Sequence, residues 1–249
     1  MFGAYQAGVW AELSRHWQPD LVVGASIGSL NAWMIACGVQ QEEILRHWRS
    51  LESLRRHKLR LPLPPWRGLV EAGHMRELIQ EIHKSGRPSL PIGVVTTKWA
   101  GMRIQLHCNE QIGWEHLAAS CAVPFLLPQQ RIGKRWHTDG GLLSAVPLWA
   151  ASRMGATEIV TVNVLPKLPW IVRMPMKIAA RASRNNTNTK GKLNVIRIRP
   201  EPDLGTWRES CFWEQGRVER YIERGRRDAE RILGQLTTDS RPQSAHAGR

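Results

Sequence analysis

The chain has 249 residues and a formal net charge of +14. This length suits a large α/β domain that can bury a core, and no apolar run approaches the 18 or so residues of a membrane span. Its four cysteines are scattered without metal-ligand spacing. They predict reduced core residues of a cytosolic protein and no metal site. Because the N-terminus lacks the cationic and apolar regions of a signal peptide, we expect a cytoplasmic location.

A strongly basic chain is attracted to anionic partners such as nucleic acid, acidic lipid or an acidic protein. The charge is uneven, with nine Lys or Arg and no Asp or Glu between Ile159 and Pro200. The sequence contains no helix-turn-helix, zinc or RNP motif, so no nucleic-acid partner is expected. The 12 tryptophans suit membrane interfaces and ordinary cores alike.

The first part of the chain predicts an amphipathic helix over 5–17, on which Val9, Leu13 and Trp17 share one stripe. The apolar run Leu-Val-Val at 21–23 predicts a short buried strand. Later apolar patterns predict helices at 29–37, 41–54, 75–83, 115–121, 146–154 and 213–233, and strands at 90–99, 101–108, 134–138, 158–165 and 193–199. The two strands at 90–108 are close enough to form a hairpin. We expect a single domain over 1–235 and a disordered polar tail at 236–249.

The predicted strand runs directly into Gly24-Ala-Ser26-Ile27-Gly28, and a buried helix follows. Strand, Gly-x-Ser-x-Gly and helix together describe a nucleophile elbow, which exposes a serine hydroxyl at the carboxyl end of a strand. Ser26 is therefore the candidate nucleophile. The N–H of Ile27 can donate to an oxyanion there, and the free N–H groups of the helix N-terminus favour negative charge.

A serine nucleophile needs a base, and histidine is the usual one. Of the nine histidines, only His246 follows Asp139, and it lies in the predicted tail. A triad that uses an earlier acid with His137 stays open, but we expect most histidines to lie on the surface or on helix faces. Asp139-Gly140-Gly141 is the better candidate, because a carboxylate near Ser26 could accept its proton directly. A plain Asp-Gly turn is the alternative.

Four segments resemble the signature segments of patatin-like phospholipases: 3–9, 24–31, 119–124 and 138–147. The segment 226–229 also resembles the late helix of bacterial members. The resemblance covers about 3–235, with the signatures within 1–152. It implies a three-layer α/β/α sandwich with a mostly parallel central sheet. It also implies cofactor-free lipid ester hydrolysis through an acyl-serine, of phospholipase A or lysophospholipase type, with Ser26 as nucleophile and Asp139 as base.

One departure concerns the Gly-Gly-Gly-x-x-Gly loop after the first strand of that family, whose N–H groups hold the oxyanion. Here Gly3 matches only the last glycine, and neither the triple glycine nor the first strand is present. Loss of one oxyanion donor typically costs about 100–1000-fold in rate. We therefore expect weak hydrolysis and aggregation from residues 1–249, and favour a longer natural chain. The alternative is a weakened member that binds lipid or a partner.

The basic segment 167–192 is the predicted contact with lipid. Arg173, Lys177 and Arg181 are spaced four apart and would share a helix face, although Pro175 interrupts that helix. The pattern predicts peripheral contact with an anionic membrane, at the inner membrane surface.

Overall fold

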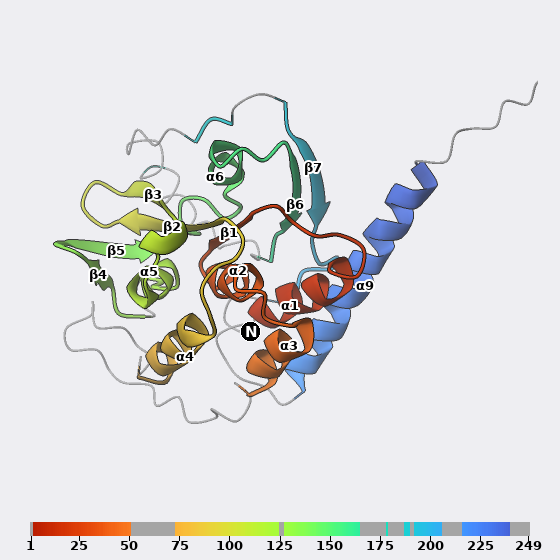
Figure 1. Cartoon of the computed structure of the whole chain (residues 1–249), viewed down its shortest axis with the longest axis horizontal. Coiled ribbons are helices and arrows are strands. Elements are labelled where there is room, and N and C mark those ends of the chain that lie inside the picture. The colour runs from red at the N-terminus through yellow and green to blue at the C-terminus, as the bar shows by residue number, and fades with distance from the viewer. Residues whose placement is uncertain are drawn as a thin grey trace, which may run out of the picture.

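The computed structural model describes residues 2–50, 73–124, 127–164, 178, 187–189, 192–205 and 216–239. Its helices and strands are interspersed along the chain (Figure 1). In order they are α1 (Phe2–Leu13), β1 (Val22–Ala25), α2 (Gly28–Ala36), α3 (Gln41–Ser50), α4 (Gly73–Lys84), β2 (Ile92–Lys98), β3 (Arg103–Cys108), a 3₁₀ turn (Asn109–Gln111), α5 (Trp114–Ser120), β4 (Gln130–Ile132), β5 (Arg135–Asp139), α6 (Leu148–Arg153), β6 (Glu158–Val162), β7 (Asn194–Ile198) and α9 (Arg217–Asp239).

Most predicted elements are present, with shifted ends. The first helix begins at Phe2 and ends at Leu13, earlier at both ends than predicted. Nearly all of the basic segment predicted to meet lipid, and the tail from 240, lie outside the described residues. In the described part of the chain, no helix has the length and apolar character needed to cross a membrane.

The five-stranded sheet is built around β2, whose residues are buried except for Lys98. One edge of β2 pairs with β3. The other edge is shared by β1, which runs parallel opposite 92–95, and β5, which runs antiparallel opposite 96–98. β1 and β5 therefore approach each other along the same edge, and their carboxyl ends meet near the middle of β2.

The prediction of a mostly parallel sheet is wrong for these strands. Only the β1–β2 pair is parallel, while β2–β3, β2–β5 and β4–β5 are antiparallel. For β2–β3 and β4–β5 the reason is the short connections, since the turns at 99–102 and 133–134 are too short for the crossover that parallel neighbours need. A separate two-stranded sheet, β6–β7, is parallel.

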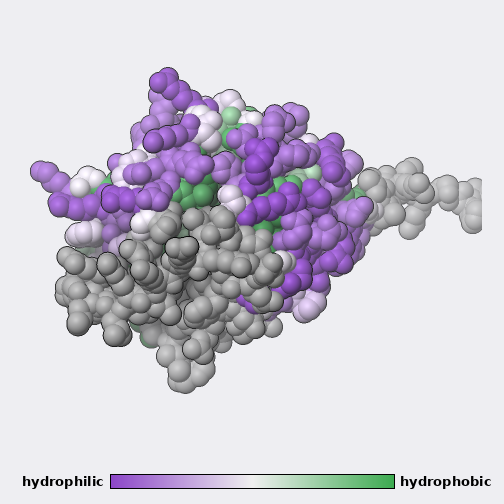
Figure 2. All heavy atoms as spheres, turned by 90° about the horizontal axis from the view of Figure 1, so that it is seen from below, coloured by the Kyte–Doolittle hydropathy of each residue, from purple (hydrophilic) through white to green (hydrophobic). Residues whose placement is uncertain are grey.

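Helices cover both faces of the sheet, which confirms the α/β class and the α/β/α layering. Val22 packs against the large core cluster, which contains the buried side chains of α1, α2, α3, α4, α5 and α9. Val23 and Ala25 point to the opposite face, where they pack against Trp149 and Ala150 of α6. This alternation follows from the two-residue period of a strand. In Figure 2 the visible described surface is mostly hydrophilic, with small hydrophobic areas between.

The first and last helices, α1 and α9, pack closely together (Figure 1). Gly8 and Gly225 make this approach possible, because a Cβ at Gly8 would press on the backbone of Ile222 and one at Gly225 on that of Tyr5. The buried Tyr5 hydroxyl donates to Asp228 at 2.9 Å. Burial and this carboxylate raise the pKa of Tyr5 well above its usual range, so the phenol stays protonated.

Candidate active site

Ser26 lies at the sharp turn between β1 and α2. Its φ of +54° is in the left-handed region, which a non-glycine residue rarely adopts. Gly24 is required for the turn, because a Cβ there would lie 2.5 Å from the Cα of Ser29. Gly28 is less constrained, since a Cβ would meet only the end of the Gln6 side chain at 3.3 Å. The backbone is strained where the hydroxyl is presented, as a nucleophile elbow requires.

The structure brings Ser26 and Asp139 together. The Ser26 hydroxyl donates to Asp139 Oδ2 at 2.5 Å. The sheet register explains the contact: β1 ends opposite Val95, and β5 ends with Asp139 opposite Thr96. Two strand ends that meet at adjacent positions of β2 place these side chains next to each other, although 113 positions separate them.

The Asp-Gly-Gly segment fixes the carboxylate in this position. The Asp139 N–H donates to the Ala122 carbonyl at 3.1 Å, and the Gly141 N–H donates to Asp139 Oδ1 at 2.6 Å. Gly140 must be glycine, because its Cα lies against the backbone of Val95 and leaves no room for a Cβ. At Gly141 a Cβ would lie 3.0 Å from Asp139 Oδ1. Both glycines therefore serve the close packing of this turn.

Burial changes the acidity of the carboxyl. Asp139 is 3% exposed. Desolvation raises its pKa to about 7, and hydrogen bonds from Ser26, Gly141 and Leu142 act in the opposite direction. A carboxylate with a pKa near neutrality is a much better proton acceptor than an ordinary exposed one. The group is therefore suited to take a proton from Ser26 and to return it within one reaction.

Ser120 supports the elbow and was not singled out by sequence reasoning. Its buried hydroxyl accepts from the Ser26 N–H at 2.9 Å and donates to the Val95 carbonyl at 2.8 Å. It thus ties Ser26 to β2 through a side chain. The only signal in the sequence is its place in the segment 119–124, one of those that carry the family resemblance.

The candidate oxyanion donors differ in position. The N–H of Ile27, the residue directly after Ser26, has no hydrogen-bond partner in the described part of the chain. Gly3 lies in α1 instead of a loop, where a Cβ would overlap the Trp48 ring and its carbonyl accepts from Asn31 at 3.0 Å. Within the described part of the chain, no hydrogen bond joins Gly3 to Ser26. Gly3 is thus a packing residue of the helix beside the elbow.

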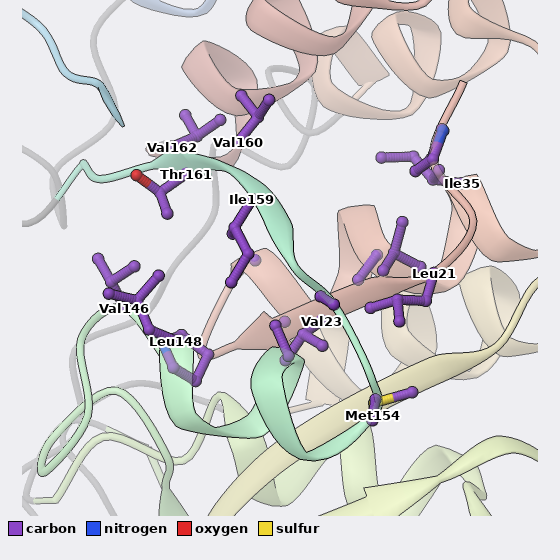
Figure 3. A pocket seen from close by; sticks show the side chains of 18 of the residues that line it. Leu21, Val23, Ile35, Val146, Leu148, Met154, Ile159, Val160, Thr161 and Val162 are labelled. Atoms are coloured by element: carbon purple, nitrogen blue, oxygen red, sulfur yellow. The ribbon is translucent and has the colours of Figure 1, made fainter. Parts of the chain in front are cut away.

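A cavity of about 660 Å³ lies beside the elbow, between β1 and β6 (Figure 3). Its walls include Val23, Leu148 and Ile159. The Val22 N–H donates to the Pro91 carbonyl on the β2 side, so alternation along the strand turns the backbone groups of Val23 the other way, toward the cavity. Among the described strands, β1 therefore has one paired edge and one open edge.

Three histidines, His107, His116 and His137, cluster around β2, and His137 is buried in a strand, whereas we expected most histidines on the surface or on helix faces. His137 is 2% exposed. The Thr96 hydroxyl bridges His107 Nε2 at 2.9 Å and His137 Nδ1 at 3.0 Å. His116 packs edge-on against His107, with ring centroids 4.5 Å apart. Neither nitrogen of His137 bonds Ser26 or Asp139. In the described residues no three metal-ligating side chains are arranged to hold an ion.

This histidine cluster predicts acid sensitivity. Burial lowers the pKa of His107 to about 3 and that of His137 to about 4. Between these values and the usual pKa of about 6.5, the unfolded chain binds protons that the folded chain does not, so stability falls as pH falls through this window. For the parent protein, we expect the urea concentration at the unfolding midpoint to be lower at pH 4.5 than at pH 7.5.

The matched variant is His107→Gln combined with His137→Gln, which should show a smaller drop over the same pH range. Asp139 acts in the opposite direction, because its raised pKa makes stability fall as pH rises from about 4 to about 7. Comparing the two proteins cancels that contribution. If the urea midpoint dropped equally in both proteins, His107 and His137 would not be the cause of the acid sensitivity.

The fold and the site together define a class: an α/β protein with a strained serine elbow whose hydroxyl bonds a buried aspartate. The sequence profile of the patatin-like phospholipases matches residues 1–152. The chain belongs to this family.

Among solved structures the chain is similar to VipD from Legionella pneumophila, with a TM-score of 0.54 and 12% identity. That alignment covers 94% of this chain and 65% of VipD, so this chain spans less than two thirds of VipD's length. At this identity the likeness concerns the fold. No match was found among the curated proteins.

Proposed function

We propose that Ser26 and Asp139 act as a catalytic dyad that hydrolyses acyl esters of phospholipids, in a phospholipase A or lysophospholipase reaction. The observation that carries the proposal is the 2.5 Å hydrogen bond from the Ser26 hydroxyl to the buried Asp139 carboxylate. Family membership supports a lipid ester as the substrate class.

The first half of the reaction forms an acyl-serine. Ser26 Oγ attacks the ester carbonyl carbon while its proton passes to Asp139 Oδ2. The carbonyl oxygen becomes an oxyanion, which the Ile27 N–H and the N-terminal end of α2 stabilise. When the tetrahedral intermediate collapses, the bond to the alcohol breaks, and the proton on Asp139 moves to the departing alkoxide.

The second half releases the fatty acid. Water attacks the acyl-serine carbonyl and gives a proton to Asp139, and collapse returns that proton to Ser26 Oγ. The dyad thus ends in its starting state without a cofactor. Water must reach the carbonyl from the solvent side, because Asp139 is itself buried.

A fluorophosphonate probe tests the nucleophile. The parent protein should be labelled at Ser26, since such probes react with activated serines. Ser26→Ala should abolish labelling. Ser50→Ala, at an exposed position at the end of α3, is the control and should be labelled as fully as the parent. Equal labelling of the Ser26 variant, detected by mass spectrometry of the intact protein, would contradict the proposal.

A second candidate function is lipid binding with little turnover. It is favoured by the position of Gly3, which leaves the Ile27 N–H as the main backbone donor identified in the described site. Removal of an oxyanion donor typically lowers kcat by about 100–1000-fold. A chain that is labelled at Ser26 but hydrolyses phosphatidylcholine and p-nitrophenyl butyrate at barely detectable rates would support this reading over an efficient enzyme.

A further inference from the structure

Two β-hairpins end side by side at one end of the five-stranded sheet. The β2–β3 turn occupies 99–102, and the β4–β5 turn occupies 133–134. The Trp99 N–H donates to the Trp136 carbonyl at 2.9 Å, which continues the β2–β5 pairing and joins the two hairpins. Figure 1 shows both on the side of the molecule away from α9. We refer to residues 98–103 and 130–136 as the hairpin tips.

The hairpin tips expose two neighbouring tryptophans. Trp99 is 48% exposed and Trp136 is 54% exposed. Large apolar side chains are usually covered, and a cluster that is not covered marks an interaction site more often than a single exposed residue does. Tryptophan has an apolar ring with a polar N–H group, and it is enriched at membrane–water interfaces, where the ring is buried and the N–H meets water.

The hairpin tips are also strongly basic. They contain five cations and no Asp or Glu: Lys98, Arg103, Arg131, Lys134 and Arg135. None of the five forms an ion pair with a carboxylate of the described residues. The pKa of Lys98 is lowered by desolvation and by the nearby Arg135 and Arg103. These charges repel one another, and an anionic surface would relieve the repulsion.

The hairpin tips lie a short distance along β2 from the dyad, which is opposite the middle of that strand. Ser26 follows the strand position opposite Val95, and Asp139 is opposite Thr96. Trp99 comes three residues further along the chain, which is about 10 Å at the rise of a β-strand. A flat surface that touches the hairpin tips would therefore lie close to the site where the ester must bind.

We propose that the hairpin tips dock on an anionic lipid bilayer, with Trp99 and Trp136 in the headgroup region and the five cations near lipid phosphates. The inference rests on the proposed function for its choice of partner. A basic surface with exposed aromatic rings also suits single-stranded nucleic acid. The bilayer is favoured because the surface adjoins the active-site edge of a lipid acyl hydrolase.

The test is vesicle co-sedimentation of the full chain carrying Ser26→Ala, which prevents hydrolysis of the vesicles. Vesicles of phosphatidylglycerol and phosphatidylcholine in equal parts should bind the protein more tightly than pure phosphatidylcholine vesicles. Adding Lys134→Gln and Arg135→Gln should weaken binding to the anionic vesicles by about 30-fold, from the usual contribution of a cation near such a surface. Trp99→Ala with Trp136→Ala should weaken it by about 10-fold.

Matched controls change the same residue types elsewhere. Lys84→Gln with Arg87→Gln removes two exposed cations near α4, and Trp17→Ala removes an exposed tryptophan after α1. Both should bind anionic vesicles as the parent does. Equal binding by the hairpin-tip variants and the parent, equal affinity for the two kinds of vesicle, or tighter binding to a 30-nucleotide oligo(dT) than to anionic vesicles would overturn the proposal.

Vesicle binding by the Ser26→Ala protein does not depend on catalysis, so this test is separate from that of the dyad. A failed dyad would leave the binding pattern intact. In an active background, the tryptophan variant should hydrolyse dispersed p-nitrophenyl butyrate at the parent's rate and vesicle phospholipid about 10-fold more slowly, in line with its binding loss. Equal losses on both substrates would indicate damage to the active site and would contradict a docking role.

Discussion

Replacement of Asp139 by Asn is expected to lower ester hydrolysis by about 100- to 10,000-fold, the usual contribution of a general base. The amide has nearly the shape of the carboxyl but cannot accept the Ser26 proton. It also removes a buried ionisable group. Burial raises the pKa of the Asp139 carboxyl to about 7 in the parent protein, because desolvation disfavours its ionised form. The variant should therefore melt no lower than the parent at pH 8, as circular dichroism would show.

The pH profile of the parent gives a second check on Asp139. The base must be ionised to work, so kcat/KM for p-nitrophenyl butyrate should rise with pH through an apparent pKa near 7. An exposed aspartate would give a rise near 4 instead. Asp203→Asn changes an exposed carboxyl and should leave the profile unaltered. A profile that is flat from pH 5 to 8 would exclude Asp139 as the titrating base.

Gly225→Ala is expected to destabilise the fold more than any other single methyl addition in α9. The new Cβ would lie closer than 3.0 Å to the Tyr5 carbonyl and to the Val9 backbone N, both in a packed helix that cannot shift freely. Such overpacking typically costs about 1–3 kcal/mol. The cost should exceed the gain of about 1 kcal/mol that Ala brings over Gly inside a helix.

Gly234→Ala is the matched control for this prediction. It lies in the same helix, and a Cβ added there would meet nothing within 4 Å. This variant should keep the full gain in helix propensity, so its urea midpoint should be at or above that of the parent. If both variants shifted the midpoint alike, the close approach of α1 and α9 would not limit stability.

The nucleophile elbow could be predicted because its signals are local. Strand, glycines, serine and helix are consecutive in the sequence, and each has a direct conformational meaning. The position of Asp139 beside Ser26 is different, because it depends on β1 and β5 sharing one edge of β2. Pairings of that kind are set by the whole sheet, so before the structure the two residues were linked only by the lack of a well-placed histidine and by the family resemblance.

Predictions from the sequence were wrong where long-range packing decides the outcome. A histidine in a short alternating strand gives no sign of which face it occupies, so the burial of His137 beside Thr96 was missed. Ser120 was overlooked for a similar reason, since its partners Ser26 and Val95 come from two other elements. The β2–β3 hairpin could be predicted because its turn at 99–102 is short, whereas the antiparallel β2–β5 pair is long-range and was not predicted.

The open edge of β1 affects how the site tolerates mutation. Among the described strands, β1 is aligned by β2 alone, and the Ser120 hydroxyl adds one bond to the same neighbour. Because no second described strand holds β1, a displacement of β2 would also displace Ser26. Substitutions at buried β2 positions such as Val94 and Val95 should therefore be purged by selection as strictly as those in the elbow itself.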